Sequence, residues 1–191
     1  MVRGFRRPGR LRPRVVQAKL AIPFVGEISG EWAPQAAERD AAWELYVELV
    51  TRVSIVPLPA GGGLLREAFT SLHDLFDITR SILRKYGADT AAADPGRMSF
   101  AAIAIGVLNG IRPLLTTWHP ELLAYEATRA DGVSVTEHER AWPPHDELRQ
   151  RIADLQTMLR ETAELLREAC GAASLLPALV AVPSPTAPPV P

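Results

Sequence analysis

Two segments of the chain carry apolar residues at heptad spacing for three turns or more. One set is Leu65, Phe69, Leu72, Phe76, Thr79, Leu83 and Tyr86, and the other is Leu148, Ile152, Leu155, Leu159, Thr162, Leu166 and Ala169. Alternating steps of four and three place each set along one side of an α-helix, and that side must be buried against other helices. The spacing therefore predicts an all-α fold, an antiparallel four-helix bundle.

Proline, glycine and capping residues set the expected helix ends. Gly87 is the expected C-cap of the second helix, and Ser99 is the expected N-cap of the third. Pro113 lacks an amide donor, so it is expected to bend or interrupt the third helix. With a short extra helix after this bend, the expected helices span about 34–53, 64–86, 100–114, 120–129 and 144–169.

Two finer expectations concern packing. The inner stripe of the first helix is expected to contain Trp43, Tyr46, Val50 and Val53. In the third helix, Gly106 and Gly110 are small enough to let neighbouring backbones approach closely.

The charge distribution divides the chain into three parts. Residues 1–33 contain seven basic and two acidic residues, a net charge of +5, whereas the rest of the chain carries −6. Residues 172–191 contain six prolines and no charged residue. We therefore expect a basic N-terminal arm (1–33) that is partly extended or disordered, a helical-bundle domain (34–171) and a disordered proline-rich tail (172–191).

Within the arm, residues 15–24 alternate between apolar and polar side chains, which is typical of a half-buried strand. The only candidate for a partner strand is the short segment 133–135. The alternative is an extended strap packed on the bundle, with 26–30 as a loop.

The arm also carries the arginines that suit contact with nucleic acid. They are Arg3, Arg6, Arg7, Arg10, Arg12 and Arg14. One hypothesis is that they bind phosphate; the other is that they form a solvated leader.

Arg112 and His119 stand in an Arg-x6-His spacing, which resembles the Arg-x4-6-His signature of the HEPN ribonuclease superfamily. The resemblance implies a metal-independent RNA-cleaving site between two protomers, in which Arg112 stabilises phosphate charge and His119 transfers protons, with Asn109 as a helper. This chain departs from the family at Pro113, where the family usually has a polar residue. The alternative is structural: Arg112 caps carbonyls around Pro113, and His119 begins a turn.

A polar cluster over residues 137–147 contains histidine and carboxylate side chains, the types that bind metals. Its spacing matches neither a zinc nor a di-iron pattern, and two prolines interrupt it. We predict no metal site and no cofactor, and a polar loop that leads into the last helix.

Aromatic and basic residues between positions 118 and 142 form the candidate interaction surface. They are Trp118, His119, Tyr125, Arg129, Arg140 and Trp142. Such residues dominate protein interfaces, but they also suit a role in sealing the end of a bundle.

The expected function is a non-enzymatic interaction module, an adaptor or regulatory subunit, that binds a protein partner or forms a homo-oligomer. The ribonuclease and the nucleic-acid binder are the alternatives. The single cysteine, Cys170, and the lack of a long uninterrupted apolar segment predict a cytoplasmic protein that does not bind membranes. Segments 42–49 and 118–123 resemble an uncharacterised bacterial helical family.

Overall fold

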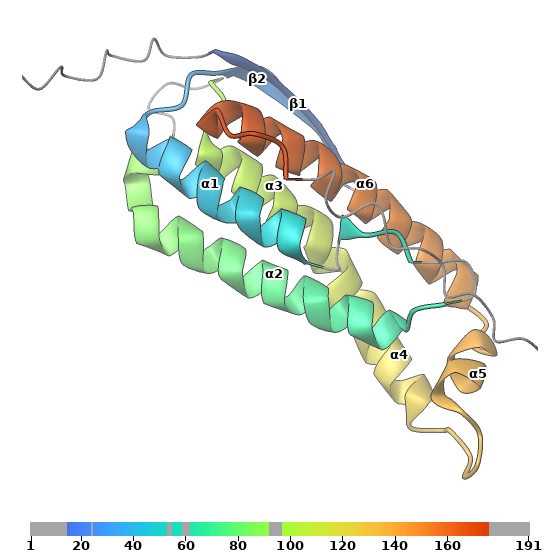
Figure 1. Cartoon of the computed structure of the whole chain (residues 1–191). Coiled ribbons are helices and arrows are strands. Elements are labelled where there is room, and N and C mark those ends of the chain that lie inside the picture. Colours follow the sequence, from blue (N-terminus) through green and yellow to red (C-terminus); the bar gives the residue numbers. More distant parts are fainter. Residues whose placement is uncertain (1–14, 24, 53–54, 59–61, 92–96, 176–191) are drawn as a thin grey trace, which may run out of the picture.

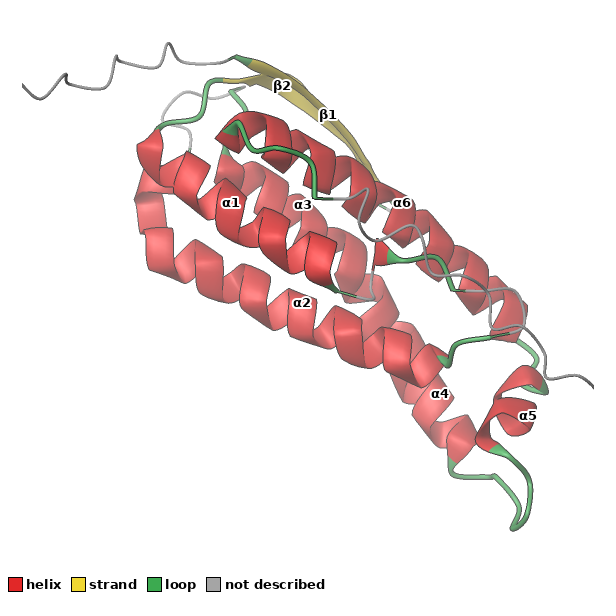
Figure 2. Ribbon diagram, in the orientation of Figure 1, coloured by secondary structure: helices red, strands yellow, loops and turns green. Residues whose placement is uncertain are grey.

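The computed structural model describes residues 15–23, 25–52, 55–58, 62–91 and 97–175, and this part of the chain is mostly helical. Figures 1 and 2 show a strand hairpin followed by helices. The described residues form two strands and six α-helices, with shorter helical turns between some of them. The elements are β1 (Val16–Ile22), β2 (Gly26–Trp32), α1 (Ala36–Thr51), α2 (Leu65–Tyr86), α3 (Phe100–Pro113), α4 (His119–Glu126), α5 (Val135–Arg140) and α6 (His145–Cys170). The expected disorder of the first 14 and the last 16 residues lies outside the described residues.

The N-terminal strands form an antiparallel hairpin, with register from Val16 opposite Trp32 to Ile22 opposite Gly26. Alternate residues of β1 are buried, as the period of two predicts, and β1 packs on α3 and α6. The prediction of a loop at 26–30 is wrong, and so is the choice of 133–135 as partner. β2 contains glycine, glutamate and serine, so its own pattern is a weak strand signal. The all-α prediction is accordingly corrected to a mostly helical fold with a two-stranded sheet.

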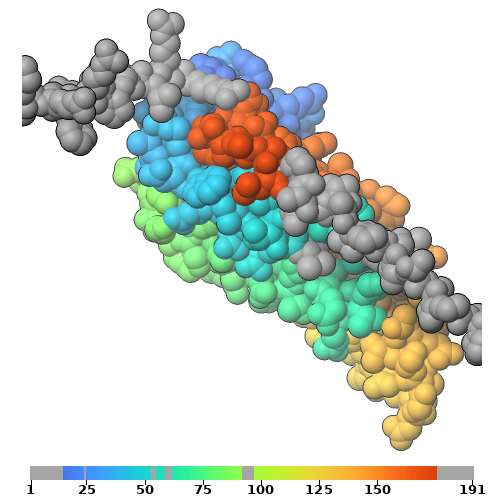
Figure 3. Space-filling model, in the orientation of Figure 1, coloured from blue at the N-terminus to red at the C-terminus, as the bar shows by residue number. Residues whose placement is uncertain are grey.

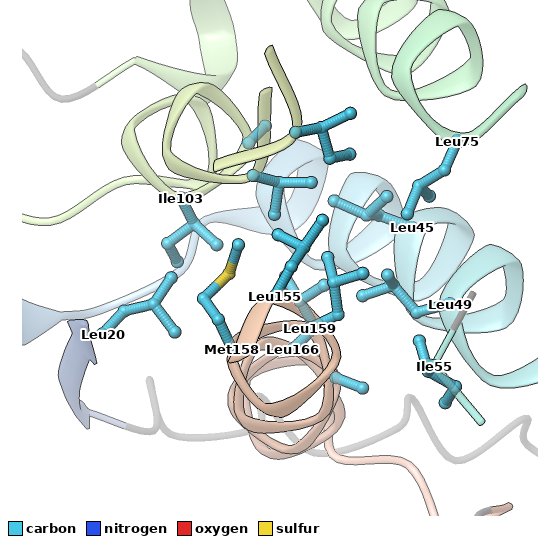
Figure 4. Close-up of a cluster of buried hydrophobic side chains, with 14 of the residues drawn as sticks. Leu20, Leu45, Leu49, Ile55, Leu75, Ile103, Leu155, Met158, Leu159 and Leu166 are labelled. Atoms are coloured by element: carbon cyan, nitrogen blue, oxygen red, sulfur yellow. The ribbon is translucent and has the colours of Figure 1, made fainter. Parts of the chain in front are cut away.

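The two heptad-bearing segments form the longest α-helices of the described chain, α2 and α6. α1 packs on α2 and α6, and α3 also packs on both. Figure 4 shows Leu155 and Leu159 of α6 among leucines of α1 and α2, including Leu45 and Leu75. The stripe of α6 therefore faces the core along its whole length. In α2, four of the seven stripe residues are buried, whereas Phe76, Leu83 and Tyr86 are only half-buried.

Two threonines in the stripes are fully buried, and each satisfies its hydroxyl within its own helix. Thr79 Oγ1 donates to the Leu75 carbonyl (2.7 Å), and Thr162 Oγ1 donates to the Met158 carbonyl (2.9 Å). A hydroxyl bonded one turn back leaves no unpaired donor in the core.

The expected inner stripe of α1 is partly wrong. Tyr46 and Val50 are buried as predicted, but Trp43 is 44% exposed, and Val53 lies outside the described residues. Because consecutive residues turn by about 100° in an α-helix, Trp43 lies about 120° around the helix from Leu49, a fully buried residue of the same helix. This offset carries Trp43 away from the core and onto the surface.

The third helix begins as predicted: Ser99 Oγ accepts a hydrogen bond from the Ala102 amide (3.2 Å). Gly106 and Gly110 have close neighbours, but these are side chains rather than the backbones that we expected. A Cβ at Gly110 would lie 2.7 Å from Met158 Cε, and one at Gly106 would lie 3.0 Å from Ile22 Cδ1.

Pro113 does not interrupt the helix. After it, residues Leu114–Trp118 form a π-helical segment that leads directly into α4, and the His119 amide donates to the Leu114 carbonyl five residues back. A π segment places one extra residue in the turn, so the α-helical hydrogen-bond pattern changes directly after the proline while the chain stays helical.

The helix that results, Phe100–Glu126, is long and apolar enough to cross a membrane by length and composition. Half of its most apolar window is buried inside this structure. A core helix of a folded domain has the same composition, so the finding is weak evidence for a membrane segment.

Buried carboxyl groups tie distant elements together. Glu38 of α1 accepts hydrogen bonds from the Trp32 indole (3.0 Å), the Gln35 amide (2.9 Å) and the Phe100 amide (2.9 Å). Glu139 of α5 accepts the Leu65 amide at the start of α2, with both oxygens at 3.0 Å. Carboxylates placed at helix N-termini satisfy free amides and favour the helix dipole.

Candidate docking groove between α1 and α2

A surface groove of about 360 Å³ runs between α1 and α2. We call it the Trp43 groove. It is lined by Trp43, Glu44, Val47 and Glu48 of α1 and by Ile78, Ser81, Ile82 and Lys85 of α2. These residues recur every three or four positions, so each helix contributes one strip along its length. The volume is within the range of small-molecule and peptide sites.

The groove combines apolar and charged side chains. Val47 and Ile78 are half-buried and Ile82 is 4% exposed, whereas Trp43 remains 44% exposed. The Trp43 and Tyr46 ring centroids are 5.9 Å apart, so the indole is supported by a buried ring. A large aromatic side chain held at a groove and still open to solvent is typical of a contact residue.

The charged residues of the groove are already paired. Glu44 forms an ion pair with Lys85 and accepts the Tyr86 hydroxyl (2.8 Å). Glu48 accepts two hydrogen bonds from Arg52, at 3.0 and 2.8 Å. Because each carboxylate already has a basic partner, an apolar segment can bind in the groove without leaving a carboxylate charge uncompensated.

These contacts shift the pKa values of the group. Burial raises the pKa of Glu44, but hydrogen bonds from Lys85 and Tyr86 and the Lys85 charge lower it by more, so it lies below its ordinary value. The hydrogen bond with Glu44 raises the pKa of Lys85. Burial, followed by the hydrogen bond with Glu44, raises the pKa of Tyr86. All three shifts favour the state in which Glu44 is charged and Tyr86 is neutral.

The Glu44 contacts predict a pH-dependent contribution to stability. A carboxyl group whose pKa is lowered in the folded state stabilises that state above its ordinary pKa, and the stabilisation disappears as the pH falls through the folded value. We expect the melting-temperature difference between the wild type and Glu44→Gln to shrink from about pH 6 to about pH 3. Thermal denaturation across this range measures it. The exposed Glu161→Gln is the control, and a Glu44→Gln difference that does not change with pH would contradict the assignment.

The predicted interaction residues around Trp118 lie together at the other end of the helices. The Trp118 and Trp142 ring centroids are 6.3 Å apart in an edge-on pair, and Tyr125 lies 6.0 Å from Trp142 and stacks on His138 at 4.3 Å. Trp142 is only 6% exposed. These rings mainly contact one another, which favours the end-sealing interpretation.

The basic members of that predicted surface are exposed. Arg129 donates to the Val133 carbonyl (2.6 Å) and thereby closes the loop after α4, while Arg140 lies at the end of α5. His119 points elsewhere: its ring stacks on Phe69 of α2 at 5.2 Å.

The structure does not bring the proposed ribonuclease residues into contact. Arg112 is exposed on α3 and Asn109 is half-buried, whereas His119 is held against Phe69. Among the described residues, no hydrogen bond, ion pair or ring contact joins Arg112 to His119. The π segment between them adds a residue to one turn, which rotates later side chains by about 100° relative to an uninterrupted helix.

The polar cluster at 137–147 serves local structure. Glu139 caps α2, His138 Nε2 lies 3.0 Å from the Tyr125 carbonyl, and His145 Nδ1 lies 2.8 Å from Asp146. Over the part of the chain that the structure describes, no group of three or more His, Cys, Asp or Glu residues is placed to hold a metal ion. The six arginines of the arm lie outside the described residues.

No family model, curated protein or solved structure matches this chain. Sequence reasoning missed the Trp43 groove because it placed Trp43 in the core. The signal was weak: the apolar residues of α1 are not gathered on one side of the helix, so the sequence of α1 does not specify which of them faces the core.

Proposed function

We propose that the protein is a non-enzymatic interaction module that binds an apolar segment of a protein in the Trp43 groove. The observation that carries this proposal is the half-exposed indole of Trp43 beside Val47 and Ile78. Tryptophan is enriched among residues that contribute most to protein binding, and such residues lie in apolar pockets within a polar border. Glu44, Glu48 and Lys85 supply this border.

The proposal includes the finer architecture, in which α1, α2, α3 with α4, and α6 form an antiparallel four-helix bundle that holds the groove rigid. Contacts of α1 and α3 with both α2 and α6 support it. It also includes a cytoplasmic adaptor or regulatory subunit. The half-buried window of Phe100–Glu126 and the lone cysteine support this location.

A photo-crosslinking experiment tests the proposed function. Benzoylphenylalanine placed at Ser81, an exposed residue of the groove, is expected to form a discrete adduct with another protein in the cells that produce this chain. The adduct is expected to decrease at least about tenfold when Trp43→Ala is added, the usual effect of losing a central aromatic contact.

The crosslinker at Ile105 provides the control, because this residue is 47% exposed on α3 and does not line the groove. Equal adduct yields from Ser81 and Ile105 would overturn the proposal. So would a Ser81 adduct whose yield does not change when Trp43→Ala is added.

A further inference from the structure

We propose that the chain's own C-terminal segment, residues 176–191, occupies the Trp43 groove and competes there with the partner. This inference rests on the proposed function, because it names an occupant of the same groove. It gives the module a built-in means of regulation: the partner must displace the segment to bind.

The first support is the place from which the segment leaves. The backbone amide of Leu175 donates to the Tyr46 hydroxyl at 2.7 Å. The Tyr46 and Trp43 ring centroids are 5.9 Å apart, so the residue that receives the end of the described chain is a neighbour of the groove's indole. Figure 3 shows the C-terminal end of the described chain, in red and including the last turns of α6, beside the blue surface of α1.

The second support is length. Residues 176–191 span 16 positions, which reach about 50 Å as a polyproline II helix at about 3.1 Å per residue. The groove follows α2 from Ile78 to Lys85, a length of about 10 Å at about 1.5 Å per helical residue. The segment is therefore long enough to cross Trp43 and fill the groove without any change in the helices.

The third support is chemistry. The segment has no charged residue and holds six prolines, among them Pro185, Pro188 and Pro191 at intervals of three. This P-x-x-P spacing repeats on one side of a polyproline II helix, which binds aromatic-lined grooves with little loss of conformational entropy. Leu176, Leu179, Val180 and Val182 supply apolar side chains for contact with Val47 and Ile78. Since Glu44 and Glu48 are already paired, an uncharged segment leaves their ion pairs intact.

Tethering strengthens such a contact. A segment joined directly to the domain experiences an effective concentration in the millimolar range, so weak intrinsic binding suffices for occupancy. A partner with a similar segment then binds only when its local concentration or its affinity exceeds that of the tail.

Photo-crosslinking of the full chain tests the placement. With benzoylphenylalanine at Val182 in the purified protein, irradiation is expected to give monomeric adducts that mass spectrometry locates at residues 43–48 or 78–85. Adding Trp43→Ala is expected to lower their yield at least about tenfold, whereas Ile105→Ala leaves it unchanged. Circular dichroism checks that both variants remain helical.

Adducts elsewhere on the chain, or no adducts, would overturn the inference, as would adducts formed only between two copies. The outcome is distinct from that of the Ser81 experiment. If Ser81 forms an adduct with another protein while Val182 does not reach the groove, the proposed function stands and the tail is not its occupant. If Val182 reaches the groove but Ser81 captures no other protein even after Leu176, Leu179, Val180 and Val182 are replaced by serine, the tail contact stands and the interaction function fails.

Discussion

Replacing Glu38 with alanine is expected to lower the free energy of unfolding by about 3 kcal/mol, because three amide or indole donors lose their acceptor. Glu38 is 7% exposed and joins the Trp32 indole of β2, the Gln35 amide before α1 and the Phe100 amide at the start of α3. Each buried donor left without a partner costs about 1 to 3 kcal/mol. Urea denaturation followed by circular dichroism measures the change.

Two variants separate this effect from a general effect of substitution. Glu38→Gln keeps one carbonyl acceptor and is expected to lose about half as much stability as Glu38→Ala. Glu161→Ala, on an exposed position of α6, is expected to change stability by less than about 0.5 kcal/mol. A loss below about 1 kcal/mol for Glu38→Ala would show that this carboxyl group does not hold the hairpin, α1 and α3 together.

Replacing Leu159 with alanine is expected to lower the free energy of unfolding by about 3 to 4 kcal/mol. Leu159 is fully buried in the α6 stripe, where it packs among leucines of α1 and α6 (Figure 4). Truncation removes apolar burial and leaves a cavity that the close-packed core fills only in part. The same denaturation experiment measures the loss.

Leu123→Ala is the matched control, because Leu123 undergoes the same chemical change while 42% exposed on α4. We expect its effect to be below about 1 kcal/mol. Similar losses for the two variants would mean that the heptad stripe of α6 is not the core.

The helical part could be predicted well because its signals are local. The heptad residues of α6 and the Ser99 N-cap each depend on positions a few residues apart, and the structure places them as expected. In α2, four of the seven heptad residues are buried. Periodicity and capping arise within one helix, so they can be read without knowing its neighbours.

The hairpin could be predicted only in part. β1 alternates clearly, but β2 offers only Ile28 and Trp32 as large apolar residues, and its pairing is fixed by a short turn after Ile22. Its register depends on burial of Trp32 and on the hydrogen bond from this indole to Glu38, which belongs to another element. Such non-local contacts leave little trace in the pattern of a single strand.

The candidate site also could not be predicted from the local sequence pattern. Whether Trp43 faces the core or solvent depends on where α2 and α6 pack around α1, and a single helix does not specify this. The relative directions of Arg112 and His119 could not be read from their spacing for a related reason, since the π segment between them changes the direction in which later side chains point.

The central claim is that Trp43 is covered by a docked segment in the full chain. Fluorine NMR of protein labelled with 5-fluorotryptophan tests it directly, since the four tryptophans give separate signals and the shift between H2O and D2O reports solvent access. Fully buried Trp32 sets the lower limit. We predict that Trp43 resembles Trp32 in the full chain and becomes solvent-sensitive when Leu176, Leu179, Val180 and Val182 are replaced by serine. An equally large solvent shift of Trp43 in both proteins would contradict the account.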